Sequence, residues 1–210
     1  MAGVALLILG GKVNPVDLSL ASPYDHICCA DSGVDSARVL DLVPDSVVGD
    51  MDSISQESLE WIYNLDIEIV KYPTDKDHTD GELAITHLSL HDKVFEKIHI
   101  LGLAGDRPDH VFGNYLLLSN SVENRSIHAF VNGYLIQSVS EGKHWFSAKP
   151  NSQVSVFALR RPARVRMTGL KYSYSGLLTP LKAQGISNIA WGSFSIETSS
   201  ELLLFIELSR

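Results

Sequence analysis

The stretch HICCADSGVDSARVL, residues 26–40, carries the pattern that decides the fold. Its first five residues are mostly apolar, as expected of a short strand that is covered on both faces. A polar turn, Asp31-Ser32-Gly33, follows at once, and a run with the amphipathic spacing of a helix begins at Val34. Strand, polar loop and helix in this order form the repeating unit of a parallel α/β sheet.

The same unit recurs on both sides of this stretch. Further strands are predicted at Val4–Leu9, Ser46–Val48, Ile67–Tyr72, Ile98–Leu101 and Ile127–Val131. Helices are predicted at Val34–Leu42, Gln56–Asn64, Glu82–His91 and His110–Ser121. Capping-box spacing stands near the start of three helices, in Ser32-x-x-Asp35, Ser53-x-x-Gln56 and Thr79-x-x-Glu82. The pattern predicts an α/β fold with a doubly wound, mostly parallel sheet.

The rhythm of the sequence changes near Asn132, where the helical pattern stops. Short alternating runs follow at Tyr134–Val139, Gln153–Leu159, Val165–Gly169, Ile186–Trp191 and Leu202–Leu208. Runs of this length separated by turn residues are typical of an antiparallel β-sandwich. We therefore predict two domains, an α/β domain over residues 1–132 and a small antiparallel β-sandwich domain over residues 133–210.

The composition is that of an ordinary globular protein. Of the 210 residues, 45% are hydrophobic and 20% are charged, which excludes a disordered tail, a collagen-like repeat and a disulfide scaffold. The net charge is −8, from 25 acidic residues against 17 Lys and Arg. Binding to the phosphate backbone of nucleic acids needs clustered Lys and Arg, so we expect no nucleic-acid partner.

Two features of the sequence bear on the cellular location of the protein. Cys28 and Cys29 are adjacent and lie in an apolar run, which favours buried, reduced thiols over a disulfide. The apolar run Met1–Leu9 follows no basic residue, so a buried strand is a better interpretation than a signal peptide. No run approaches the roughly 20 apolar residues that span a bilayer. We expect no membrane association and a cytoplasmic location.

Acid-rich segments follow four of the predicted strands directly. They are Ala30–Gly33, Gly49–Ser53, Pro73–Asp80 and Gly102–His110. Because ligands of an open α/β sheet bind outside the carboxyl ends of its strands, these segments should meet in one crevice.

Carboxylates that converge in this way need a positive partner. Two of them ~4 Å apart repel by about 4 kcal/mol at an effective dielectric constant near 20. Asp50, Asp52 and Asp80 offer an all-oxygen ligand set, which favours a hard divalent cation, and Mg²⁺ commonly bridges carboxylates to substrate phosphates. A single acid such as Asp35 is more simply a helix cap, but two acids on one turn exceed what a cap requires.

Two basic residues stand among these acids. Lys76 and Arg107 could each hold a phosphate, Arg107 in a bidentate manner, and Lys76 could equally form a solvated surface ion pair. The sequence contains no Walker motif, no G-x-G-x-x-G after the first predicted strand and no G-x-S-x-G. A nucleotide would therefore be held without a Walker loop, and covalent acyl chemistry has no support.

Six short motifs occur in a fixed order along the chain. They are ADSG at 30–33, GDMDS at 49–53, KDxTD at 76–80, RxDH at 107–110 with Asn114, GLKY at 169–172 and GxSN at 185–188. In this order and at this spacing the chain resembles the thiamine pyrophosphokinase family over almost its whole length. The change of rhythm near residue 132 coincides with that family's division into two domains.

The resemblance implies an activity and an assembly. It implies a homodimer whose α/β domain binds ATP and Mg²⁺ and whose β-sandwich helps to form a thiamine pocket across the subunit interface. Members of the family transfer the β,γ-pyrophosphoryl group of ATP to the thiamine hydroxyl and release AMP.

The motifs also assign roles to residues. The Mg²⁺ ligands would be Asp50, Asp52 and Asp80. The nucleotide side would be lined by Asp31, Asp77, Arg107, Asp109, His110 and Asn114. The thiamine side would be lined by Lys76, Tyr172, Ser187 and Asn188, with Trp191 close by in the sequence. We expect Asp80 or Asp77 to orient the thiamine hydroxyl or accept its proton, which makes Asp50, Asp52, Asp77 and Asp80 the expected catalytic set.

The aromatic residues suit a flat cationic ligand. The faces of Tyr172 and Trp191 would attract a thiazolium, although core or interface packing is the simpler role for such residues. The sequence departs from the family at Val34-Asp35-Ser36, where Ala-Asn-Arg is common, and at Asp106, which adds a negative charge beside Arg107.

Two other functions use the same residues. One is a Mg²⁺-dependent phosphohydrolase or nucleotidyl transferase, and the other is a catalytically silent protein that binds thiamine or a nucleotide. The presence of all three proposed metal ligands favours the enzyme.

Overall fold

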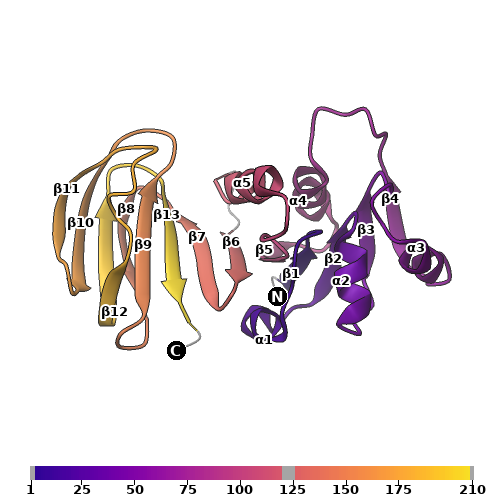
Figure 1. Cartoon of the computed structure of the whole chain (residues 1–210), viewed down its shortest axis with the longest axis horizontal. Helices are drawn as coiled ribbons and strands as arrows, with labels where there is room; N and C mark the ends of the chain where they lie inside the picture. Colours follow the sequence, from indigo (N-terminus) through magenta and orange to yellow (C-terminus); the bar gives the residue numbers. More distant parts are fainter. Residues whose placement is uncertain (1–2, 120–125, 209–210) are drawn as a thin grey trace. The chain divides into compact units, whose positions relative to one another are not determined.

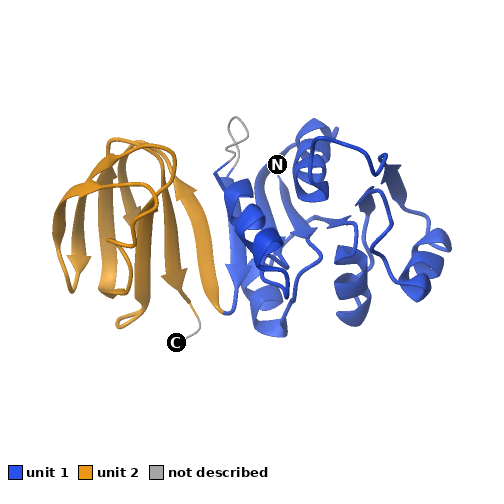
Figure 2. Ribbon diagram, turned by 45° about the horizontal axis from the view of Figure 1, so that its top comes forward, with its two compact units in different colours: residues 1–132 blue, residues 133–210 orange. Residues whose placement is uncertain are grey.

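The computed structural model describes residues 3–119 and 126–208 and contains two compact units, Met1–Asn132 and Gly133–Arg210 (Figure 2). The first unit is a parallel α/β unit and the second is an antiparallel β unit, so the predicted fold class is confirmed. No helix of the described ranges is long and apolar enough to cross a membrane.

In the described part of the first unit, six parallel strands form the sheet (Figure 1). In spatial order they are β6 (Ser126–Val131), β5 (Phe95–Leu101), β1 (Gly3–Ile8), β2 (His26–Ala30), β3 (Ser46–Gly49) and β4 (Glu68–Lys71). The direction in which the chain adds strands reverses between β1 and β5, which is the topological switch point of a doubly wound sheet. Central strands are apolar on both faces because both are covered, and Leu6, Leu7, Cys28 and Cys29 are fully buried.

The described residues of this unit form five helices beside the sheet. They are α1 (Pro15–Ala21), α2 (Gly33–Val39), α3 (Gln56–Tyr63), α4 (Asp80–Leu90) and α5 (Pro108–Leu117). Helix α1 contacts β5 and β6, α2 contacts β1 and β2, and α3 lies beside α2. Helix α4 contacts β1, β2, β3 and β5 and lies beside α5. The helix predicted at His110–Ser121 begins two residues earlier and is observed to Leu117, and its last two predicted residues, Asn120 and Ser121, lie outside the described residues.

Of the three predicted helix caps, the structure shows one and contradicts two. Thr79 caps α4 through the predicted capping box. Ser32 forms no side-chain cap on α2, and α3 is capped by Ser55 rather than Ser53. Asp35 is not a cap of its own helix either, because its carboxylate accepts hydrogen bonds from the backbone N–H and the hydroxyl of Ser55. That contact holds α2 against the beginning of α3.

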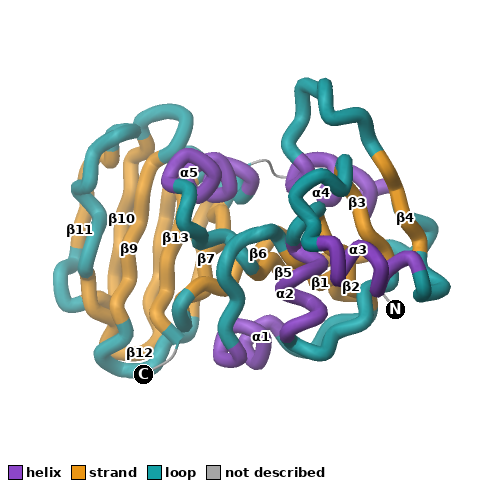
Figure 3. Tube along the Cα trace, turned by 45° about the vertical axis from the view of Figure 1, so that its right-hand side comes forward, coloured by secondary structure: helices purple, strands orange, loops and turns teal. Residues whose placement is uncertain are grey.

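The second unit is built of antiparallel strands (Figure 3). In spatial order they are β7 (Tyr134–Val139), β13 (Leu202–Glu207), β9 (Gln153–Ala158), β12 (Asn188–Thr198), β10 (Ala163–Leu170) and β11 (Tyr174–Leu178), and β8 (Gly142–Phe146) also pairs with β12. Alternate residues point inward and form an apolar core that includes Val156, Val165, Met167, Phe194 and Leu204. Alternation of this kind makes the unit sandwich-like.

Candidate active site

A pocket of about 660 Å³ lies at the carboxyl edge of the sheet in the first unit. The loops after β1, β2 and β5 line it, together with Ser53 and the first turns of α4 and α5. Its volume is in the range of small-molecule sites, and its place at the switch point between β1 and β5 is where α/β sheets bind ligands.

The loops after β1 and β5 meet at the pocket through backbone contacts. The N–H of Gly11 donates to the carbonyl oxygen of Gly102 at 3.0 Å, and the N–H of Lys12 donates to that of Ala104 at 2.6 Å. A Cβ on Gly11 would lie 2.2 Å from each of these two carbonyl oxygens, so only glycine fits there. Gly10 and Gly11 were not among the predicted site residues, although two glycines at the end of the first strand are a usable signal.

Carboxylates from separate loops converge beside this pocket, which Asp31 and Asp80 line and Asp50 and Asp52 do not. One carboxylate oxygen from each of Asp31, Asp50 and Asp52 lies within 4.8 Å of the others. A Cβ built on Gly49 would lie 3.1 Å from the Cβ of Asp31 and 3.1 Å from Oδ1 of Asp80, so these two side chains approach the same point of the backbone. We call Asp31, Asp50, Asp52 and Asp80 the acid cluster.

The grouping differs by one residue from the predicted metal ligands Asp50, Asp52 and Asp80, because Asp31 takes the place of Asp80. Asp31 had been expected on the nucleotide side. It lines the pocket, and its Oδ1 is buried and accepts no hydrogen bond from the described residues. An all-oxygen set with an unpartnered buried oxygen fits a hard divalent cation.

Lys76 lies against the acid cluster. Its Nζ is 2.7 Å from Oδ2 of Asp50 and 2.9 Å from Oδ1 of Asp80. The side chain of Lys76 is only 13% exposed, so this is not the solvated surface ion pair that the sequence had left open. The ammonium group therefore bridges Asp50, one of the three grouped carboxylates, and Asp80.

The acids differ in their electrostatic surroundings. The hydrogen bond from Lys76 holds the pKa of Asp50 below its usual value. Burial raises the pKa of Asp31, and the neighbouring carboxylates of Asp80 and Asp50 raise it further. Carboxylates without a nearby cation are thus destabilised in their charged form, which a bound cation would reverse.

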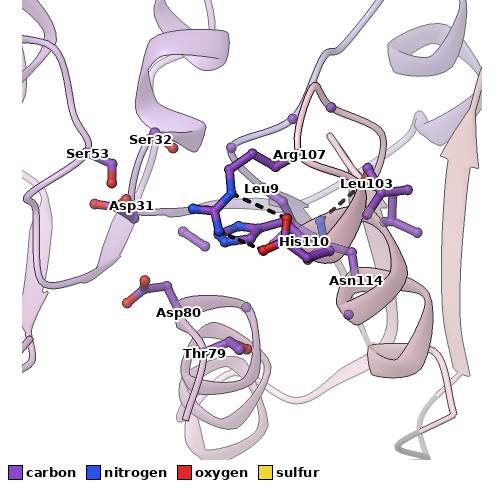
Figure 4. Close-up of a pocket in the computed structure, with 18 of the residues that line it drawn as sticks. Leu9, Asp31, Ser32, Ser53, Thr79, Asp80, Leu103, Arg107, His110 and Asn114 are labelled. Carbon is purple, nitrogen blue, oxygen red and sulfur yellow. Dashed lines mark hydrogen bonds and ion pairs between the residues drawn. The ribbon is translucent and has the colours of Figure 1, made fainter. Parts of the chain in front are cut away.

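Residues from the start of α5 lie on the other side of the pocket (Figure 4). Nη2 of Arg107 is 2.7 Å from Oδ2 of Asp109, and this contact lowers the pKa of that carboxyl. His110 lines the pocket beside them, and Nδ2 of Asn114 donates to the carbonyl oxygen of Leu103 at 3.1 Å. Asn114 therefore also fixes the loop after β5.

Two predicted details near this side come out differently. Asp77, expected on the nucleotide side, is exposed and, like Asp50, Asp52 and Lys76, is not among the residues that line the pocket. Asp106 lies 2.5 Å from Nζ of Lys12, so its extra charge is paired with that residue and not with Arg107.

The remaining predicted residues belong to the second unit. Tyr172 is 59% exposed and Trp191 is 68% exposed, which excludes core packing for both. Asn188 is buried, and its amide hydrogen-bonds to the backbone N–H and carbonyl oxygen of Tyr172. The N–H of Ser187 donates to Oγ of Ser155 at 3.1 Å. The structure thus ties Asn188 to Tyr172 and leaves both aromatic side chains accessible.

The fold and the pocket define a class of protein: a doubly wound α/β unit with an acidic ligand pocket at its switch point, joined to an antiparallel β unit. The family model of the thiamin pyrophosphokinase catalytic domain matches residues 18–131. Thiamine pyrophosphokinase of Bacillus subtilis is 30% identical over 177 residues, which is 79% of each chain. The chain belongs to the thiamin pyrophosphokinase family.

Other comparisons agree in fold or in part of the sequence. Thiamine pyrophosphokinase 1 of Oryza sativa subsp. japonica is 38% identical over 79 residues, 36% of this chain and 30% of that protein. The crystal structure of the Bacillus subtilis enzyme superposes with a TM-score of 0.84 at 22% identity, covering 99% of this chain and 100% of that one. The Candida albicans enzyme gives 0.83 at 20% identity, covering 99% and 90%.

Proposed function

We propose that this chain is a thiamine pyrophosphokinase, which transfers the pyrophosphoryl group of ATP to the hydroxyl of thiamine and gives thiamine diphosphate and AMP. Family membership supports this reaction class. The observation that carries the proposal is the convergence of the acid cluster beside a pocket. Two of its members, Asp31 and Asp80, line that pocket together with Arg107 and the first turns of two helices.

The pocket suits the polyphosphate of a nucleotide. The first turns of α4 and α5 line it, and the free N–H groups and dipole at a helix N-terminus favour an anion. Arg107 can hold a phosphate in a bidentate manner once its guanidinium leaves Asp109. We place the nucleotide here, with Asp31, Asp109, His110 and Asn114 around it.

We assign Mg²⁺ to the acid cluster, with Asp50 and Asp52 as ligands together with Asp80. The oxygen donors and the unpartnered Oδ1 of Asp31 support a divalent cation at this position. Bound there, Mg²⁺ neutralises charge on the carboxylates and on the polyphosphate.

The reaction then needs positioning more than covalent catalysis. The hydroxyl oxygen of thiamine forms a bond to the β-phosphorus while the bond from that phosphorus to the α,β-bridging oxygen breaks, and AMP leaves with the bridging oxygen. The hydroxyl proton passes to a carboxylate, for which Asp80 and Asp77 both remain candidates. Arg107 and the helix N-termini stabilise the charge on the phosphates.

The second unit is assigned to thiamine. The exposed rings of Tyr172 and Trp191 can stack on a flat ring and attract a thiazolium through their faces. Ser187 and Asn188 belong to the same assignment, as do a homodimer with the thiamine site at its interface and a cytoplasmic location, all of which rest on the family resemblance.

Product analysis tests the proposal. The protein is incubated with ATP, Mg²⁺ and thiamine, and AMP, ADP and thiamine diphosphate are followed by chromatography. Equal amounts of AMP and thiamine diphosphate, formed only when thiamine and metal are present, are expected. ADP with thiamine monophosphate would indicate a simple kinase. Nucleotide hydrolysis independent of thiamine would indicate the phosphohydrolase, and absence of turnover would indicate a binding protein.

A further inference from the structure

The connection between β4 and α4 contains an exposed segment, Pro73–His78, which we call the 73–78 loop (Figure 1). Five of its six residues are exposed, and Lys76 alone is partly buried. Throughout the described ranges, its only hydrogen bond to the rest of the first unit is the one from Lys76 to Asp50. The ion pair of Lys76 with Asp80 and a 3.9 Å approach of His78 to Glu82 are the other polar contacts.

The anchor of this loop therefore lies on the carboxylates assigned to Mg²⁺. Nζ of Lys76 is within 3 Å of one oxygen of Asp50 and one of Asp80, and the side chain of Asp50 is only 9% exposed. A divalent cation binds carboxylate oxygens at about 2.0–2.1 Å when it is Mg²⁺, so it would take the place that the ammonium group now holds. The ammonium group of Lys76 and a divalent cation bound to the same carboxylates would also repel each other.

We infer that Lys76 and the divalent cation compete for Asp50 and Asp80, so that metal binding detaches the 73–78 loop from the acid cluster. This inference rests on the proposed function. The two ion pairs of Lys76 occupy one oxygen each of Asp50 and Asp80, which are two of the three expected metal ligands.

The release has a consequence for the site. Once Lys76 leaves the carboxylates, its positive charge stands on a loop that has no other hydrogen bond to the described part of the first unit. The ammonium group can then follow the incoming phosphates. Metal binding and the positioning of Lys76 are in this way a single coupled step.

The first test measures metal affinity. Isothermal titration calorimetry with Mg²⁺ compares the full chain with Lys76→Gln and with the control Lys71→Gln, which removes the same charge from an exposed residue of β4. We expect Lys76→Gln to lower the Kd for Mg²⁺ roughly tenfold, since one competing hydrogen-bonded ion pair is gone, and Lys71→Gln to change it less than about twofold.

The second test follows the loop itself. An endoproteinase that cleaves before aspartate is used, and mass spectrometry follows the cuts before Asp75 and Asp77. In the natural sequence, Mg²⁺ should accelerate these cuts several-fold. Lys76→Gln should be cut rapidly without Mg²⁺ and should not respond to it, and Lys71→Gln should behave like the natural sequence.

The outcomes separate this inference from the proposed function. One outcome would overturn the inference and leave the proposed function intact. In it, the natural sequence forms thiamine diphosphate normally, binds Mg²⁺ with the same affinity as Lys76→Gln, and is cleaved at a rate that does not depend on Mg²⁺. Tighter binding in Lys76→Gln without Mg²⁺-dependent cleavage of the natural sequence would also overturn it, because the lysine would then repel the metal without leaving. If neither the natural sequence nor Lys76→Gln binds Mg²⁺ or makes thiamine diphosphate, both the inference and the proposed function are wrong.

Discussion

Replacing Asn188 tests how the second unit presents an aromatic side chain. Oδ1 of Asn188 accepts hydrogen bonds from the backbone N–H of Tyr172 at 3.0 Å and of Ile189 at 2.9 Å. Its Nδ2 donates to the carbonyl oxygen of Tyr172 at 2.7 Å. The amide of Asn188 therefore holds the backbone of Tyr172. We expect Asn188 to affect thiamine binding indirectly, through the position of the Tyr172 ring.

The size of the effect follows from these contacts. Asn188→Ala removes the partner of the backbone N–H groups of Tyr172 and Ile189 and of the carbonyl of Tyr172, and each such group costs about 1–3 kcal/mol when it stays buried. Water can reach the exposed side of Tyr172, so we expect a total loss of about 2–4 kcal/mol in the free energy of unfolding. That corresponds to a fall of roughly 5–10 °C in the melting temperature.

Two further variants sharpen the prediction. Asn188→Asp keeps an acceptor for the N–H of Tyr172 but sets a carboxylate oxygen against its carbonyl oxygen, so it should destabilise at least as much as Asn188→Ala. Asn64→Ala is the control, because it removes a hydrogen bond from an exposed helix end and should cost less than about 1 kcal/mol.

Calorimetry and steady-state kinetics read out both consequences. Both Asn188 variants should melt earlier and show a raised KM for thiamine, with a smaller change in kcat. A raised KM with an unchanged melting temperature would mean that Asn188 contacts the substrate directly. An unchanged KM and melting temperature would refute the role of the amide altogether.

The remaining predictions concern the first unit. Asp52→Asn should lower turnover on the order of a hundredfold with an unchanged fold, while the exposed Asp92→Asn should not, and normal rates in Asp52→Asn would remove the metal assignment. Gly11→Ala should destabilise by more than about 2 kcal/mol because its Cβ meets two carbonyl oxygens, whereas Gly113→Ala, with open space, should stabilise α5 by about 0.5–1 kcal/mol in the same thermal melt. Burial, with smaller contributions from His99 and Lys97, lowers the pKa of His128 from 6.5 to about 4. The unfolded chain then binds more protons, so stability present above pH 6.5 is lost as the pH falls, by about 2 kcal/mol between pH 7 and pH 5. His128→Leu should remove that loss in urea titrations at the two pH values, and parallel curves for the two proteins would contradict the assignment.

Much of the first unit could be predicted because buried parallel strands are apolar on both faces. The strand His26–Ala30 is observed with its predicted bounds, and the neighbouring strands differ at their ends by a few residues. Helix α1 was missed because seven residues hold barely two turns of periodicity. Asn14 and Pro15 nonetheless mark its start, since Asn14 caps the N–H of Asp17 and Pro15 is the first helical residue.

Short strands of the second unit were harder to find. Strands β8 and β11 were not predicted, because their five residues expose large side chains that sequence alone assigns to loops or to a core. Trp145 of β8 is 70% exposed and lies under Nζ of Lys143, 5.3 Å from the ring centroid. Pairing with β12 makes this segment a strand, and that pairing depends on distant residues.

The candidate site, too, could be predicted from the sequence only in part. That the acids should meet at one edge follows from the carboxyl-end rule, and the structure brings Asp31, Asp50 and Asp52 together. Which oxygens face one another depends on how far the 73–78 loop reaches, and no local pattern encodes the contact of Lys76 with Asp80. The cap at Ser55 is similar, since Asp35 of another helix takes part in it.

The charges at the pocket show why the acid cluster and an anionic substrate belong to one mechanism. Only two of the four carboxylates of the acid cluster contact the ammonium group of Lys76, and Arg107 is already paired with Asp109. A polyphosphate that entered alone would meet net negative charge at one end of the pocket and favourable helix N-termini at the other. A divalent cation removes the first obstacle, and the release of Lys76 supplies a second positive group for the same phosphates. The acids that repel the nucleotide in the absence of metal are thus the groups that make its binding depend on metal.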